Sequence, residues 1–150
     1  MNTAIRSILL LSLLSAAAIA QAEIVVQEAW VRATVAQQHA TGAFLQIRSS
    51  QDVRLVAVQT AAAGISEVHE MKMENDVMKM RALPYLDIAA GKTVELKPGG
   101  LHIMLMDLHG QAKAGEKLPL KLIFETKDKK RETVEVNANV KNMNASDGKM

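Results

Sequence analysis

The feature that most limits the fold of this chain is a succession of short runs in which apolar and polar residues alternate. Such a two-residue period places alternate side chains on opposite faces of a β-strand, and turn residues separate the runs. No stretch between them has a helical period. The sequence therefore predicts an all-β fold, a sandwich or barrel of about eight or nine short strands. The expected strands are Ile24–Arg32, Gly42–Arg48, Val53–Gln59, Ile65–Met73, Val77–Leu83, Thr93–Leu96, His102–Leu108, Pro119–Glu125 and Thr133–Asn139.

The first 22 residues differ from the rest of the chain. A basic residue precedes an apolar run from Ile8 to Ala20, and Ala20-Gln21-Ala22 has the small-x-small pattern of a signal-peptidase site. The run has 13 residues, whereas a membrane-spanning helix needs about 20. We expect residues 1–22 to be a cleaved signal peptide, residues 23–140 to form one domain and residues 141–150 to form a loose tail. The mature chain is expected in the periplasm, without stable membrane insertion.

Charge and cysteine content exclude several functions. The formal net charge is +2, from 18 Lys and Arg against 16 Asp and Glu, so nucleic-acid binding is not expected. The basic run KDKKR at 127–131 lies between two alternating segments and is expected to be a solvated hairpin turn. The chain has no cysteine, which excludes a disulfide framework, thiolate zinc sites, blue-copper sites and iron–sulfur clusters. It also leaves no thiol for lipid attachment after the signal.

Histidine and methionine concentrate in two places. The stretch VHEMKMENDVMKM, residues 68–80, holds four of the nine methionines and one of the four histidines. A second stretch, GGLHIMLMDL at 99–108, alternates donors with aliphatic residues that are expected to face the core. The donors that share a strand face are His69, Met71 and Met73 on one strand, Met78 and Met80 on the next, and His102, Met104 and Met106 on a third.

The pairing of the first two of these strands depends on the loop between them. With a loop of Glu74-Asn75, or of Met73 to Asp76, Met71 would oppose Met78 and His69 would oppose Met80. Directly opposed side chains have Cβ atoms about 4.5–5.5 Å apart. A three-residue loop would instead place His69 opposite Arg81, which is no metal ligand. We expect the first arrangement.

Two histidines and two methionines, with no thiolate or carboxylate, suit a soft monovalent ion, and Cu(I) is the biological candidate. Each residue also has a simpler interpretation. One histidine on a strand is more often structural than a ligand, and Met104 and Met106 could fill the core. The paired occurrence of His and Met on two separate segments favours the metal site. His39 and His109 fall in expected loops and are left unassigned.

The spacing of these residues resembles that of a known family. Ten residues separate His69 from Met80, twenty-one separate Met80 from His102, and one separates His102 from Met104. This spacing looks like the metal motif of the periplasmic copper chaperones called PCu(A)C. Four further stretches are similar to that family's other recurrent segments: AWVRAT (29–34), TGAFLQI (41–47), GKTVELKPGGLHIMLMDL (91–108) and LKLIFE (120–125). The resemblance implies a cupredoxin-like barrel that holds one Cu(I) near its surface through His69, Met80, His102 and Met104.

The resemblance also implies a function. Such a protein carries Cu(I) and passes it by ligand exchange to an acceptor, such as a cytochrome c oxidase subunit or another copper carrier. We therefore expect a monomeric carrier and not an enzyme, with Met71, Met73, Met78 and Met106 either as a secondary soft rim or as a shield against water. Some members of the family carry a His- and Met-rich extension that can hold Cu(II). The tail here has Met143 and Met150 but no His, so the resemblance does not support a second, Cu(II)-type site. The alternative is a metal-free peptide-binding or adhesion module with a methionine-rich surface.

Overall fold

The computed structural model describes residues 21–142, and within this range the protein is built from strands and turns without a helix. The predicted all-β class is confirmed. The ten strands are β1 (Ile24–Arg32), β2 (Ala40–Ser49), β3 (Val53–Gln59), β4 (Ala63–Glu74), β5 (Val77–Leu83), β6 (Leu86–Ile88), β7 (Thr93–Leu96), β8 (His102–Leu108), β9 (Lys117–Thr126) and β10 (Arg131–Lys141). Five strands match the expected bounds, four are longer, and β6 was missed because three residues are too few to show a period.

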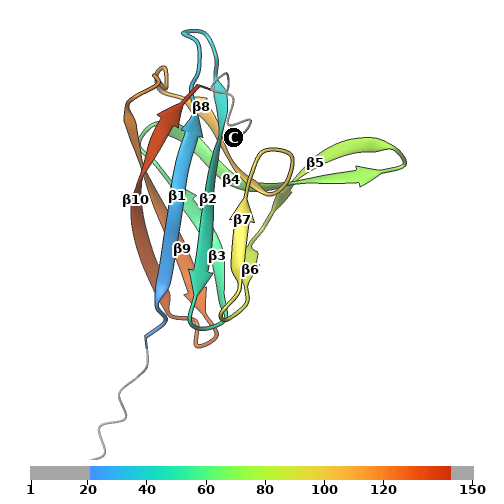
Figure 1. The fold of residues 1–150 in the computed structure, drawn as a ribbon, viewed down its shortest axis with the longest axis vertical. Coiled ribbons are helices and arrows are strands. Elements are labelled where there is room, and N and C mark those ends of the chain that lie inside the picture. The colour runs from blue at the N-terminus through green and yellow to red at the C-terminus, as the bar shows by residue number, and fades with distance from the viewer. Residues whose placement is uncertain (1–20, 143–150) are drawn as a thin grey trace, which may run out of the picture.

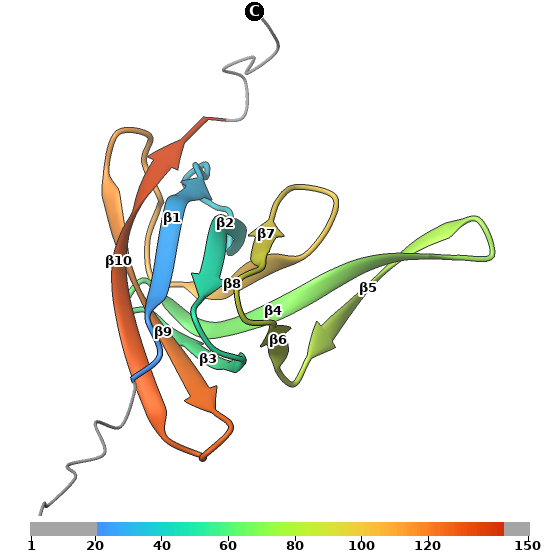
Figure 2. The same cartoon turned by 60° about the horizontal axis from the view of Figure 1, so that its bottom comes forward.

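All ten strands belong to one sheet, with the order β5-β4-β8-β2-β1-β10-β9-β3-β6 and β7 paired with β2. The sheet curls around its core, and one hairpin, β4–β5, stands clear of the rest in both views (Figures 1 and 2). Neighbouring strands are antiparallel except β1 and β10, which are parallel. The fold is thus a compact rolled sheet with one projecting arm.

The core consists of the alternate aliphatic side chains that the sequence pattern predicts. On β8, Ile103 and Leu105 are fully buried, whereas Met104 and Met106 on the opposite face are only half-buried. The largest fully buried side chains come from six other strands as well. They are Val31, Leu45, Ile47, Leu55, Ile88, Leu96, Leu120, Leu122 and Phe124.

The β4–β5 hairpin has a different register from the one we expected. Its loop is Asn75-Asp76, flanked by the opposed pair Glu74 and Val77. Both loop residues have positive φ, 49° and 61°, which is the backbone of a type I′ turn. Asn and Asp tolerate that conformation better than other non-glycine residues do. The turn therefore selects this loop, and the prediction that His69 opposes Met80 is wrong.

The structure also bears on the predictions for the basic turn and for the two ends of the chain. KDKKR connects β9 to β10 as an exposed turn, and Lys127 in it pairs with Asp52 at 2.8 Å. Ala22, the last residue of the predicted signal peptide, is buried against the core. Strand β10 includes Lys141, the first residue of the predicted tail. Residues 1–20 and 143–150, which hold most of both predicted segments, lie outside the described residues.

Candidate metal centre

The two predicted histidine ligands are brought together by the pairing of β4 with β8. His69 is directly opposite His102 in this antiparallel ladder. The centroids of their rings are 5.8 Å apart, and the ring planes are inclined by 60°. The rings therefore lie side by side on the face of the sheet opposite Ile103 and Leu105. Two imidazoles in this arrangement are close enough to share one small ion.

His102 is held from two sides. Its Nδ1 lies 2.9 Å from the Gly100 carbonyl oxygen. Because a carbonyl only accepts hydrogen bonds, Nδ1 carries the hydrogen and Nε2 is the ring nitrogen with a free lone pair. The same carbonyl accepts a hydrogen bond from the Met71 backbone N–H at 3.4 Å. The loop before β8 is thus joined both to the ring and to the neighbouring strand, and only 6% of His102 is exposed.

An aromatic row supports His102 on its other side. The Phe44 ring centroid lies 6.4 Å from that of His102 and 4.5 Å from that of Trp30. The Phe44 ring lies over Gly42, where an added Cβ would come within 2.8 Å of it. Gly42 is therefore needed for Phe44 to occupy this position. The TGAF sequence of β2 builds the wall against which His102 packs.

His69 has one ring nitrogen engaged and one without a partner. Its Nε2 lies 2.8 Å from the Glu67 carboxylate oxygen Oε2, which can only accept, so Nε2 carries the hydrogen. Its Nδ1 is buried and has no hydrogen-bond partner in the described part of the chain. A buried nitrogen lone pair without a partner is costly. A bound metal ion would satisfy it, so His69 fits the ligand role through Nδ1.

The two methionines of the motif lie on opposite sides of the histidine pair. Met104 opposes Glu67 in the β4–β8 ladder, and Met80 opposes Met71 in the β4–β5 ladder. Each is therefore a diagonal neighbour of His69, and diagonal neighbours lie about 7–8 Å apart, within reach of long side chains. His69 is the common neighbour of the other three residues. Met104 is half-buried, whereas Met80 is 49% exposed.

The donors beside the histidine pair are thioethers and the Glu67 carboxylate, which already contacts His69 Nε2. Within residues 21–142 no group of three or more His, Cys, Asp and Glu side chains is placed to hold a metal. The thioethers of Met80 and Met104 are the further donor groups next to the pair. Of the other two histidines, His109 has its ring engaged, with Nδ1 2.9 Å from the Ala61 carbonyl oxygen. His39 accepts a hydrogen bond from Leu108 N–H through its backbone carbonyl.

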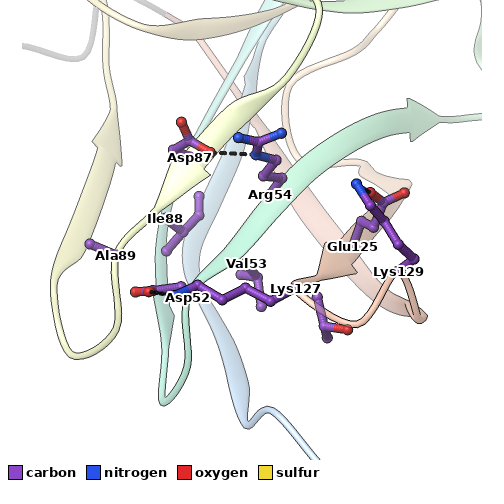
Figure 3. Close-up of a pocket in the computed structure, with 10 residues that line it drawn as sticks. Asp52, Val53, Arg54, Asp87, Ile88, Ala89, Glu125, Lys127 and Lys129 are labelled. Atoms are coloured by element: carbon purple, nitrogen blue, oxygen red, sulfur yellow. Dashed lines mark hydrogen bonds and ion pairs between the residues drawn. The ribbon is translucent and has the colours of Figure 1, made fainter.

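The hollow shown in Figure 3 offers a contrast to this site. It is lined by residues of β3, β6 and the β9–β10 turn, and its cations are already paired with carboxylates. Arg54 contacts Asp87 at 2.8 Å, Lys127 contacts Asp52 at 2.8 Å and Lys129 contacts Glu125 at 3.4 Å. The hydrogen bond and charge of Lys127, with a hydrogen bond from the Ala90 N–H, lower the pKa of Asp52, and Asp52 in turn raises the pKa of Lys127. These balanced pairs leave no charge to recruit an ion.

Two residues that support the histidine pair, Glu67 and Phe44, were not predicted from the sequence. Glu67 precedes His69 by two positions and shares its face, so strand alternation alone was enough to find it. Phe44 had no such signal, because its contact with His102 depends on the pairing of β2 with β8.

The described residues thus form an all-β domain, a rolled sheet with two opposed histidines and methionines beside them. Solved structures of PCuAC domains share the fold. The copper-bound PCuAC domain from PmoF2 has a TM-score of 0.65 at 20% identity, covering 79% of this chain and 92% of that one. Apo-DR1885 from Deinococcus radiodurans has a TM-score of 0.58 at 26% identity, covering 95% and 97%. CuI-DR1885 from the same organism is 30% identical, with a TM-score of 0.55 over 77% and 76% of the two chains.

The chain belongs to the LpqE-like family, described as "Putative lipoprotein LpqE-like", whose model matches residues 24–140. A curated relative, "Putative lipoprotein Lxx21020" of Leifsonia xyli subsp. xyli, is 36% identical over 102 residues, and the match covers 66% of this chain and 60% of that protein. The expected resemblance to PCu(A)C domains is confirmed for the fold by the solved structures, whereas the matching family model is the LpqE-like one.

Proposed function

We propose that the protein binds one Cu(I) ion per chain through His69, Met80, His102 and Met104. The observation that carries this proposal is the opposed histidine pair, in which His69 Nδ1 is buried without a partner. With His102 Nδ1 engaged by Gly100, the nitrogens that face the ion are His69 Nδ1 and His102 Nε2. The copper-bound state of similar PCuAC domains, including CuI-DR1885 of Deinococcus radiodurans, supports the choice of ion.

The donor set favours Cu(I) over harder ions. Thioethers are neutral and soft, and they bind Cu(I) better than Zn(II) or Cu(II). The nearest carboxylate, that of Glu67, is engaged by His69 Nε2. Glu67 therefore acts as a positioning residue that fixes the ring and its tautomer, as carboxylates next to metal-bound histidines commonly do.

We further propose that the protein is a carrier and not an enzyme. Met80 is about half exposed and lies on the projecting arm, so ligands of an acceptor can reach the ion from that side (Figure 2). Transfer is an exchange of ligands in which copper stays Cu(I) and each donor that leaves is replaced by one of the acceptor. The acceptor in this proposal is a copper site such as that of a cytochrome c oxidase subunit, or another copper carrier.

The proposed location is the periplasm, after removal of residues 1–22. The lipoprotein names of the matching family and of the Leifsonia relative support an exported protein of the cell envelope. The chain itself contains no cysteine for lipid attachment. Residues 21–142 include no helix that is long and apolar enough to cross a membrane.

The test is an anaerobic titration of the purified mature protein with Cu(I) against a chromophoric competitor. We expect one tight equivalent for the parent, retained by the control Met106→Leu and lost by Met80→Leu/Met104→Leu. The control removes a thioether from β8 without touching the proposed ligands. Equal binding by all three proteins, or no competition by the parent, would instead favour the metal-free module with a methionine-rich surface.

A further inference from the structure

The arm beyond the histidine pair carries four thioethers on one face, a group that we call the thioether face: Met71, Met73, Met78 and Met80. The β4–β5 register makes two directly opposed pairs of them, Met71 with Met80 and Met73 with Met78. Met73 is 58% exposed, Met80 49% and Met78 46%. A run of methionines this exposed is not core filler.

The opposite face of the arm is charged, and two exposed ion pairs cross it from strand to strand. Arg81 contacts Glu70 at 2.9 Å, and Lys79 contacts Glu74 at 3.3 Å. The type I′ turn at Asn75-Asp76 sets the register of the hairpin. Met73 and Met78 are about half exposed, so burial in the core does not explain their residue type.

The spacing also separates the tip pair from the histidine site. Met73 lies four residues from His69 on the same strand, which corresponds to about 13 Å along it. At this distance Met73 and Met78 neither complete the histidine site nor shield it from water. They face one another, with Cβ atoms about 4.5–5.5 Å apart for a directly opposed pair. Two thioether sulfurs at this spacing can hold one Cu(I) between them, since such an ion accepts few, soft ligands.

We propose that the thioether face is a second, weaker Cu(I) site, formed by Met73 and Met78 with a third thioether from Met71 or Met80. The role of this second site would be to load the histidine site with Cu(I), so the inference rests on the proposed function. Met80 is a diagonal neighbour both of Met73 and of His69, so it can bind the ion at the tip and keep it while imidazole nitrogens replace the other thioethers. The step exchanges neutral ligands, and copper remains Cu(I) throughout.

The experiment compares the parent with Met73→Leu/Met78→Leu in the same anaerobic titration, followed by NMR of the methionine methyl groups. We expect the parent to bind a second Cu(I) at least about tenfold more weakly than the first, with the Met73 and Met78 methyl signals shifting mainly during the second equivalent. The variant should keep the tight equivalent, lose the weak one and load its tight site more slowly. Met106→Leu is the matched control and should behave as the parent.

A parent that binds only one equivalent, or a second equivalent that survives Met73→Leu/Met78→Leu, would overturn the inference. The variant His69→Gln separates this outcome from failure of the proposed function, because it removes an imidazole and leaves every thioether in place. Retention of the weak equivalent in His69→Gln supports an independent thioether site. If the parent shows only a weak equivalent that depends on Met73 and Met78, the thioether site stands and the histidine carrier site is wrong.

Discussion

The middle and the tip of strand β4 place metal-donor residues in different surroundings. At the base of the arm, in the middle of the strand, Val68 is buried, and the His69 side chain is 12% exposed and lies beside His102. At its tip, Met73 is 58% exposed and belongs to a hairpin that projects from the barrel (Figure 2). The comparison indicates two roles for one strand. The base fixes the geometry of the imidazoles, and the tip presents thioethers to solvent, where ions and acceptors arrive.

The first prediction tests whether base and tip differ in stability. Leu105→Ala, three residues from His102 along β8 and on the core side of that strand, should lower the free energy of unfolding by about 2–5 kcal/mol, since it leaves a cavity at a fully buried position. Met78→Ala at the tip should change it by no more than about 0.5 kcal/mol, as exposed substitutions usually do. Denaturant unfolding followed by the fluorescence of Trp30, the single tryptophan, measures both. Equal losses would mean that the arm is packed and not free.

The second prediction concerns the wall behind His102. Gly42→Ala places a methyl group against the Phe44 ring, and overpacking of this kind costs about 1–3 kcal/mol. The displaced Phe44 should also shift the NMR signals of the His102 ring, while those of the methionines at the tip stay unchanged. Gly110→Ala is a suitable control, because no atom lies within 4 Å of the Cβ position there. Unchanged His102 signals in Gly42→Ala would show that the ring does not depend on this wall.

The third prediction concerns the orientation of His69. Glu67→Ala removes the acceptor of the Nε2 hydrogen bond, and loss of such a contact typically costs about 10–100-fold in metal affinity. Glu67→Gln should recover much of this loss, because its amide oxygen still accepts from Nε2–H. Nitrogen-15 NMR of the imidazole should show the Nε2–H tautomer in the parent and in Glu67→Gln, but a mixture in Glu67→Ala. Equal affinity and tautomer in all three proteins would remove Glu67 from the site.

The smallest expected effect concerns the ion pair of Lys127 with Asp52 in the hollow of Figure 3. The pKa of Asp52 is lowered by Lys127, so this pair stabilises the fold above the ordinary aspartate pKa and loses that contribution as pH falls through the lowered value. Lys127→Gln should therefore destabilise the protein slightly at about pH 6, and its difference from the parent should shrink towards about pH 3. Thermal unfolding at several pH values measures this. A difference that is constant with pH would show that the ion pair contributes nothing.

How much the sequence revealed differs along the chain. The period of two placed Ile103 and Leu105 in the core and His102 and Met104 on the other face, because burial alone decides strand alternation. The same period did not decide which residues of β4 and β5 face each other. The expected loop, Glu74-Asn75, and the observed loop, Asn75-Asp76, both keep the methionines of the two strands on one face. That choice depends on the positive φ of Asn75 and Asp76. The contacts of His102 with Phe44 and Gly100 depend on pairings between distant segments, which no local pattern encodes.

The most direct test of the central claim is X-ray absorption spectroscopy of the protein loaded anaerobically with one equivalent of Cu(I). The proposed site predicts a first shell of imidazole nitrogens from His69 and His102 together with thioether sulfur from Met80 and Met104. A shell of sulfur alone would place the first copper on the thioether face of the arm, and a shell of oxygen and nitrogen without sulfur would show that the methionines are not ligands. Either of these two results would contradict the account.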